Sequence, residues 1–262
     1  MVSWSWPQHG LTNKAPRKTL LIRCSASRRL VLEEKQTVKE SDENLFRTMR
    51  EKLFSAVISD ALDELGYLHQ FLPPEIRPVR DNMIVAGRAM TVLHQDSPGA
   101  EVPGNSQPTL GLMLKALDDL RSNEVYVASG SSAAYALFGE HMAIRAKRLG
   151  CVGAVVDGYS RDTNGIRELN FPTFSRGWYG LDQRPRGRVI EFRVPMRIGE
   201  VQVAPGDIVF GDIDGVVVIP KKLEAQVLEN AMERIDREHK VRETLKSGSL
   251  STTAIVEKFG LL

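Results

Sequence analysis

The fold is built around Cys151-Val-Gly-Ala-Val-Val-Asp-Gly-Tyr-Ser-Arg-Asp162. Its β-branched apolar run, Val152 to Val156, predicts a buried strand. The strand ends at the turn signal Asp157-Gly158 and is followed by the pair Arg161-Asp162. Arginine suits a carboxylate or enolate oxygen, and aspartate offers hard oxygen to a divalent cation. The pair is therefore either a ligand site at a strand end or an ion pair in a polar surface turn.

A helix is expected directly before this strand, over residues 139–149, because apolar residues recur there at helical spacing and Gly150 is a suitable terminator. The N–H groups of Gly139 to Met142 would then be free to bind an anion. A further short strand is expected over 125–128. If the two strands are parallel neighbours, the helix start and Arg161-Asp162 fall on the same side of the sheet.

The rest of the chain also reads as mixed α/β. In the N-terminal half the pattern predicts a helix over 44–65 capped by Gly66, one or two strands over 83–93 with a bulge or bend at Gly87, a loop over 94–108 and a helix over 110–120. In the C-terminal half it predicts a short strand over 169–174, antiparallel strands over 189–203 and a hairpin about Asp214-Gly215. A helix over 223–245 and a short helix after Gly248 follow. In the hairpin, Asp212 and Asp214 are either metal ligands or, more commonly for this pattern, turn residues.

Composition and charge exclude several classes of protein. The chain has 262 residues, of which 42% are hydrophobic and 26% charged, and it holds two cysteines without a CxxC pair. No apolar run reaches the roughly 20 residues that span a bilayer, and a disulfide framework or a structural zinc site is not indicated. Neither a membrane nor a nucleic-acid partner is expected.

The first 32 residues differ from the remainder. They carry six basic residues and no acidic one, which leaves 29 basic and 33 acidic residues, a net charge of −4, for the rest. Three interpretations of such an N-terminus are open: a transit peptide, a disordered extension, or translated sequence that results from a wrongly chosen start codon. The predicted division is an N-terminal extension over 1–43 and one domain over 44–262. The expected compartment is cytoplasmic, or mitochondrial or plastid if residues 1–32 are a targeting segment.

Three segments together resemble the family of the regulator of ribonuclease activity A. They are GSSAAYALFGEHMAIRAKRLGCVGAVVDGYSRD (130–162), FPTFSRG (171–177) and PGDIVFGDIDGVVVIP (205–220). The resemblance covers about residues 44–235, and the family includes class II, metal-dependent 4-hydroxy-4-methyl-2-oxoglutarate aldolases. It implies a single layered α/β/β/α domain of the swivelling β/β/α type and a homotrimer or hexamer.

The resemblance also implies roles for individual residues. Gly139, Glu140, His141 and Met142 match the loop whose backbone holds the pyruvyl carboxylate, Arg161 matches the arginine on the pyruvyl oxygen, and Asp162 matches the ligand of Mg²⁺ or Mn²⁺. Glu140 and Arg161 would be the catalytic residues, with Glu140 orienting a water molecule. The implied reaction is retro-aldol cleavage of a 4-hydroxy-2-keto acid to pyruvate, with oxaloacetate decarboxylation as a side activity through the same enolate.

The resemblance leaves other functions open. Some relatives are non-catalytic regulators that bind and inhibit an RNA-degrading endonuclease, and these lack the acidic residue after the signature arginine. Asp162 therefore favours an enzyme. A methyltransferase is disfavoured, because no Gly-rich strand–turn–helix loop is present. The sequence departs from the family's pattern at Glu140, where aspartate is usual, at the longer segment Ser97–Asn105 and at the N-terminal extension.

Overall fold

The computed structural model describes residues 42–97 and 111–260. The predicted extension over 1–43 lies outside these ranges apart from its last two residues, and so does most of the predicted loop over 94–108. Within the described ranges, no helix combines the length and the apolar character needed to cross a membrane.

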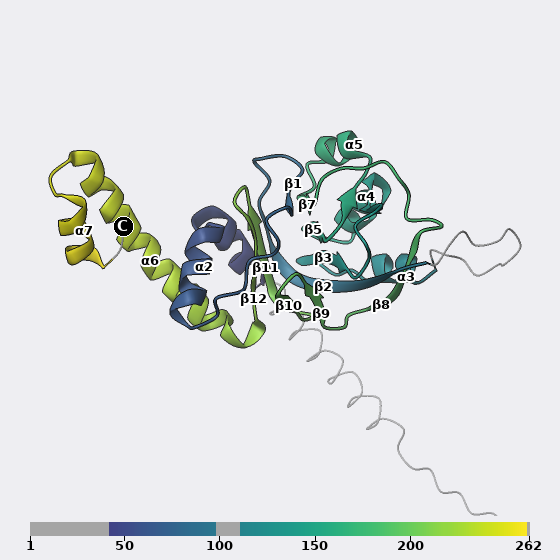
Figure 1. Cartoon of the computed structure of the whole chain (residues 1–262), viewed down its shortest axis with the longest axis horizontal. Coiled ribbons are helices and arrows are strands. Elements are labelled where there is room, and N and C mark those ends of the chain that lie inside the picture. Colours follow the sequence, from purple (N-terminus) through teal and green to yellow (C-terminus); the bar gives the residue numbers. More distant parts are fainter. Residues whose placement is uncertain (1–41, 98–110, 261–262) are drawn as a thin grey trace, which may run out of the picture. The chain divides into compact units, whose positions relative to one another are not determined.

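A single sheet of eight strands organises the domain (Figure 1). Its order is β1-β7-β5-β3-β2-β11-β12, and β8 also pairs with β2. The strands are β1 Arg77–Pro78, β2 Val85–Asp96, β3 Glu124–Ser129, β5 Gly153–Val156, β7 Thr173–Ser175, β8 Gly187–Phe192, β11 Ile208–Asp212 and β12 Gly215–Ile219. Strands β3 and β5 are parallel neighbours, as expected. The Arg77 guanidinium of β1 donates to the Ile213 carbonyl in the β11–β12 turn, 3.1 Å away, so the sheet is nearly closed into a barrel.

Helices cover this sheet from two sides (Figure 1). Residues 42–52, α2 Ser55–Glu64 and α6 Glu224–Ser247 pack on β11 and β12. On the other side, α3 Gly111–Asp118 and α4 Glu140–Arg148 bury their apolar faces against the central strands. The remaining elements are β4 Ala136–Phe138, β6 Tyr159–Ser160, α5 Thr163–Glu168, the antiparallel pair β9 Met196–Ile198 and β10 Val201–Val203, a 3₁₀ turn at Lys221–Leu223 and α7 Thr252–Phe259. The predicted layered α/β domain is confirmed.

The helix predicted over 44–65 is wrong in one respect, because it is broken at Leu53 and Phe54. The Asp212 carboxylate accepts hydrogen bonds from the Ser55 backbone N–H at 2.8 Å and from the Ser55 hydroxyl at 2.6 Å. A side chain from the β11–β12 hairpin therefore starts α2 anew, which local periodicity does not reveal. The predicted cap is confirmed, since Gly66 follows α2 with φ +80°.

Three other predictions near strand ends were also wrong. Strand β2 runs on to Asp96, so His94 lies in a strand and not in a loop, and the bulge is between Leu93 and His94 instead of at Gly87. Gly87 serves close packing, because a Cβ there would lie 2.6 Å from the Asn123 carbonyl oxygen. The segment predicted as a strand over 169–174 begins at the end of α5, and only Thr173–Ser175 is extended.

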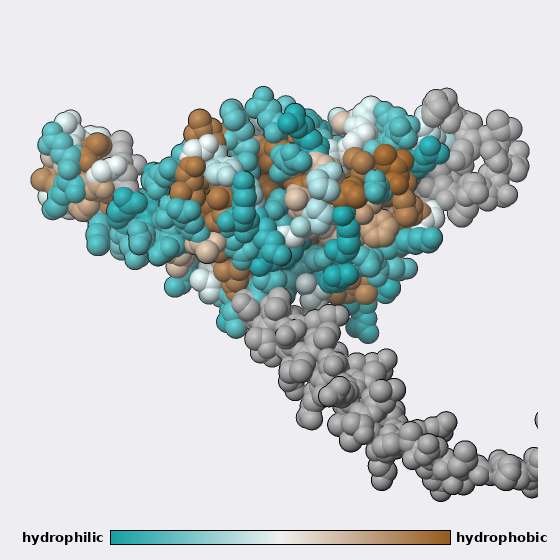
Figure 2. Space-filling view, turned by 90° about the horizontal axis from the view of Figure 1, so that it is seen from below, coloured by the Kyte–Doolittle hydropathy of each residue, from teal (hydrophilic) through white to brown (hydrophobic). Residues whose placement is uncertain are grey.

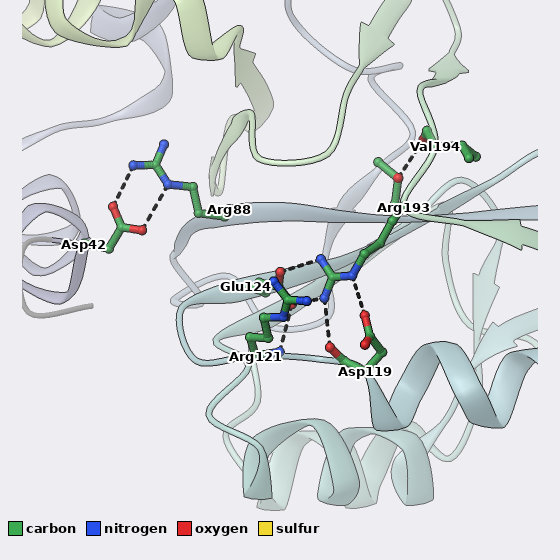
Figure 3. A network of polar contacts seen from close by, with 8 residues as sticks. Asp42, Arg88, Asp119, Arg121, Glu124, Arg193 and Val194 are labelled. Carbon is green, nitrogen blue, oxygen red and sulfur yellow. Dashed lines mark hydrogen bonds and ion pairs between the residues drawn. The ribbon is translucent and has the colours of Figure 1, made fainter. Parts of the chain in front are cut away.

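Arg193 ties the α3 side of the sheet together (Figure 3). Its guanidinium contacts the Asp119 carboxylate after α3, donates to the Asp119 carbonyl at 2.8 Å and pairs with both Glu124 carboxylate oxygens at 2.7 and 3.0 Å. Arg193 itself has φ +56°, a conformation that costs energy for a residue with a side chain. The clamp therefore holds β8, β3 and α3 in one arrangement.

Candidate active site

Two very short strands bring the two halves of the site together. Strands β4 and β6 are parallel, and the Arg161 N–H donates to the Phe138 carbonyl at 2.9 Å. Because parallel strands end at the same edge, the residues that follow them, Gly139 and Arg161-Asp162, emerge side by side. The sequence predicted this proximity from β3 and β5, but it did not predict β4 and β6.

Gly139 is the N-cap of α4 and leaves the first N–H groups of that helix without a side-chain cap. Those N–H groups and the positive end of the helix dipole can bind an anion such as a carboxylate. A Cβ at position 139 would lie 2.9 Å from the Asp162 Oδ2 atom and 3.3 Å from the Arg161 Cγ atom. A larger residue at position 139 would therefore displace the Asp162 carboxylate from its place against the start of this helix.

Asp162 occupies a strained position. It is the N-cap of α5 with φ 56° and ψ 39°, in the left-handed region, yet its side chain makes no capping hydrogen bond to that helix. Its carboxylate lies beside Gly139 instead, 3.6 Å from the Arg161 Nε atom. Strain of this kind is concentrated at functional sites, where the surrounding structure enforces it.

A cavity of about 340 Å³ opens over this pair. Five of the predicted site residues line it: Gly139, His141, Met142, Arg161 and Asp162. The sixth, Glu140, lies outside the lining. Its carboxyl group packs against Gly165 of α5, so closely that a Cβ at that glycine would overlap it. The role predicted for Glu140 therefore stays a prediction.

The structure adds Asp182, Gln183 and Arg184 to the cavity. The Asp182 Oδ2 atom is 3.4 Å from a terminal nitrogen of Arg161 and 3.4 Å from one of Arg184. Burial alone would raise the pKa of Asp182, but the Arg184 backbone N–H and the two guanidinium charges outweigh it and hold that pKa below its usual value. Asp182 therefore stays ionised and holds the Arg161 guanidinium.

These three residues carry only a weak signal in the sequence. They lie in an Arg- and Gly-rich loop without periodicity, and the Ala136 N–H bond to the Leu181 carbonyl brings that loop to β4.

Two acidic residues near the strand ends have structural roles, namely Asp157 in the predicted turn and Asp212, one of the two possible metal ligands in the hairpin. Asp157 accepts from the Arg176 guanidinium at 2.7 Å and from the Ser129 hydroxyl at 2.9 Å, so it braces the turn that leads to Arg161. Asp212 binds Ser55 and the Asp214 backbone N–H, which supports the turn interpretation of the hairpin.

Comparison with known proteins identifies the family. A family model described as RraA-like, Aldolase/RraA, matches residues 55–218. The chain belongs to the RraA-like family.

Members of this family and its structural neighbours carry different names. A Halalkalibacterium halodurans protein with the provisional name 4-hydroxy-4-methyl-2-oxoglutarate aldolase is 32% identical over 81% of this chain and 94% of its own length. An uncharacterised Pseudomonas syringae protein is 30% identical, with a TM-score of 0.67 over 79% of this chain and 94% of its own. RraAS2 of Streptomyces coelicolor, described as an unusual member of the RNase ES inhibitor RraA family, is 26% identical, with a TM-score of 0.65 over 76% and 96%.

The donor set of this RraA-like site suits a divalent metal that is held mainly by substrate and water. No group of three or more His, Cys, Asp or Glu side chains within residues 42–97 and 111–260 is arranged to hold a metal ion. Of the two carboxylates that line the cavity, Asp182 is paired with Arg161 and Arg184, so Asp162 is the one that would hold the ion, with water and substrate oxygens completing the sphere. Mg²⁺ is often held in this way, by one or two carboxylates together with substrate oxygens and several waters. The uncapped carboxylate of Asp162 fits such an ion.

Proposed function

We propose that this RraA-like chain is a metal-dependent carbon–carbon lyase that cleaves 4-hydroxy-2-keto acids to pyruvate. The 4-hydroxy-4-methyl-2-oxoglutarate in the name of its relative belongs to this class of substrate. Decarboxylation of oxaloacetate is proposed as a side activity, because loss of its carboxylate leaves the same pyruvate enolate. The observation that carries the proposal is the placement of Arg161 and Asp162 against the uncapped start of α4, over one cavity.

The substrate's pyruvyl carboxylate would bind the free N–H groups that follow Gly139. This orientation places the adjacent keto oxygen near the Arg161 guanidinium, which donates hydrogen bonds where negative charge develops during cleavage. The Asp182 carboxylate lies 3.4 Å from a terminal nitrogen of that guanidinium. The arginine is therefore positioned before the substrate binds, so little reorganisation is needed as the charge forms.

Asp162 would hold the divalent cation, Mg²⁺ or Mn²⁺. When bound, such a cation supplies Lewis acidity toward the keto oxygen, which contributes several kcal/mol to the stabilisation of the enolate. Glu140, in the first turn of α4, is proposed to orient the water that accepts the proton of the substrate hydroxyl. The same group would later return a proton to the enolate carbon.

A protein regulator is the second candidate, because the Streptomyces neighbour is described as a member of an RNase ES inhibitor family. The Asp162 carboxylate favours the enzyme, because it makes no capping hydrogen bond and lines the cavity, where it is available to a cation. Assembly as a homotrimer or hexamer, a cytoplasmic location and the division into an extension over 1–43 and a domain over 44–262 are further parts of the proposal.

The test is a panel of 4-hydroxy-2-keto acids, incubated with the full chain and Mg²⁺ or Mn²⁺, with and without EDTA. Pyruvate is the expected product, and both EDTA and the Arg161→Ala and Asp162→Ala substitutions should abolish its release. Folded, intact protein that releases no pyruvate under any of these conditions would refute the enzyme and leave the regulator.

A further inference from the structure

We infer that Gly165 is a positioning residue for the proposed reaction, because its lack of a side chain lets the Glu140 carboxyl group lie against the first turn of α5. The inference rests on the proposed function, in which Glu140 orients a water molecule and Asp162 holds the cation. It assigns a task to a residue outside the cavity lining, namely to fix where the Glu140 carboxylate lies.

The contact between α4 and α5 at Gly165 is very close. A Cβ at position 165 would lie 2.2 Å from the Cδ atom of Glu140, 2.4 Å from its Oε2 atom and 2.6 Å from its Oε1 atom. The added atom would thus overlap the whole carboxyl group, since carbon atoms in favourable contact stay about 3.5–4.0 Å apart. The Glu140 carboxyl group therefore occupies the space in which any other residue at position 165 would carry its side chain.

Glycine is a poor choice for this position by local propensity. Gly165 lies within α5, and its carbonyl oxygen accepts the Leu169 N–H at 2.9 Å, as in a regular helix. Its φ is not positive, so the backbone conformation does not require glycine. Glycine weakens a helix relative to alanine. A residue that weakens its own helix in this way is typical of a place where another group approaches the backbone closely, and here that group is the Glu140 carboxyl group.

Consecutive residues of α4 contact the start of α5. Gly139 lies against the Asp162 carboxylate, since a Cβ at position 139 would be 2.9 Å from the Asp162 Oδ2 atom, and Glu140 lies against Gly165. Residues 162 and 165 are three apart, which is nearly one turn of a helix. The two carboxylates therefore belong to one local unit, in which Asp162 lines the cavity and Glu140 lies behind it on α5. A second carboxylate of this kind commonly orients the groups around a bound cation.

This unit is remote from the surface hydrophobic residues that are seen from below. Helix α5 lies at the top of Figure 1, whereas Figure 2 shows the opposite side of the molecule, where hydrophobic residues gather in several places between polar ones. Substitutions at residues 140 and 165 therefore leave that surface unchanged.

The expected effect of a methyl group at position 165 follows from these distances. The Glu140 carboxyl group would have to move by more than 1 Å, from 2.2 Å to a contact of about 3.5 Å. The end of a flexible side chain moves easily, and alanine favours the helix, so the fold should keep its stability. A misplacement of about 1 Å can cost about 10²-fold in rate. We expect Gly165→Ala to lower kcat by tenfold to 10²-fold with KM little changed, because the start of α4 and Arg161 still bind the substrate.

The experiment measures pyruvate release from 4-hydroxy-4-methyl-2-oxoglutarate and from oxaloacetate, with the full chain and Mg²⁺. The proteins are the wild type, Gly165→Ala, Glu140→Asp and the double variant. Aspartate keeps the carboxylate but is one methylene shorter, so it ends short of the added Cβ. Gly165→Ala should therefore lower kcat at least tenfold in the wild-type background and less than twofold in the Glu140→Asp background. Gly180→Ala is the matched control and should change nothing, because a Cβ there has no described atom within 4 Å.

Two measurements besides activity separate positioning from a structural role. The urea midpoint of Gly165→Ala should not fall below that of the wild type, because alanine favours the helix. The affinity for Mn²⁺ without substrate, measured from the paramagnetic resonance signal of free Mn²⁺, should stay within about twofold of the wild type, because Asp162 is proposed to hold the ion.

A wild-type kcat in Gly165→Ala would overturn the inference and leave the lyase intact. An equal loss of kcat in the Glu140→Asp background would also overturn it, because the effect would then not depend on the length of the Glu140 side chain. A fall in the urea midpoint that parallels the loss of activity would do the same. Release of pyruvate from neither substrate by the wild type would overturn the proposed function and this inference with it.

Discussion

His94 should make the domain sensitive to acid. It lies in β2 with 1% of its surface exposed, and neither ring nitrogen has a hydrogen-bond partner among the described residues. Burial lowers the pKa of His94 from 6.5 to about 4, because the charged imidazolium would lose its water. The folded protein therefore holds the neutral ring, whereas the unfolded chain takes up a proton at higher pH.

The sign and size of the effect follow from this difference. Between pH 6.5 and about 4 the unfolded state binds more protons than the folded state, so the free energy of unfolding falls as the pH is lowered. The stability that the neutral His94 ring contributes to the folded protein is fully present above pH 6.5 and is lost as the pH falls toward 4. A shift from 6.5 to about 4, at 1.36 kcal/mol per pH unit, amounts to about 3 kcal/mol.

The assay is urea unfolding between pH 7 and pH 4.5 for the wild type and His94→Leu. The variant should lose less stability on acidification, and at pH 7 it should be at least as stable, because two unpaired buried nitrogens are replaced by apolar atoms. His239→Gln, an exposed position on α6, should follow the wild type. Parallel pH profiles for wild type and His94→Leu would show that the buried imidazole does not cause the acid sensitivity.

Three further substitutions test the site and its frame. Gly139→Ala should fold, because the φ of −147° at this position suits alanine. Its kcat/KM for pyruvate release should fall by about 10²-fold, because the added Cβ displaces the Asp162 carboxylate. Unchanged kinetics would show that Gly139 and Asp162 do not fit closely together. Asp182→Asn should lower kcat/KM about tenfold, because Arg161 loses the carboxylate that holds it, and Asp182→Glu should recover part of this loss. The urea midpoint of unfolding should stay unchanged in both variants. A fall in the urea midpoint that accompanies the loss of activity would instead indicate a purely structural role. Arg193→Ala should cost about 2 kcal/mol in urea unfolding, since two carboxylates lose their partner, and a cost near zero would contradict the clamp.

The parts of the fold that the sequence predicted are those with a clear period. The buried strand at Val152–Val156, the helix that follows Gly139 and the hairpin about Asp214-Gly215 each have a repeating pattern and a recognisable end. These elements were enough to predict that Gly139 and Arg161-Asp162 share one side of the sheet.

The remainder depended on contacts between distant segments. Strands β4 and β6 have three and two residues, too few to show a period, and they form because they pair with each other. The break before α2 is imposed by Asp212, and Asp182 reaches Arg161 only because its loop pairs with β4. Side chains that act on the site from a loop without periodicity cannot be recognised from one sequence.

The proposed lyase can be tested most directly by pyruvate release from oxaloacetate in the presence of Mn²⁺, compared between the wild type and Asp162→Asn. Asparagine keeps the size and shape of the side chain but removes its charge, so the affinity for the cation should fall, while the 3.6 Å contact with the Arg161 Nε atom loses its ionic character. We expect Mn²⁺-dependent release by the wild type and a loss of at least 10²-fold in the variant, restored in part at high Mn²⁺. Equal, Mn²⁺-dependent release by both proteins would contradict the assignment of Asp162 and the lyase mechanism built on it.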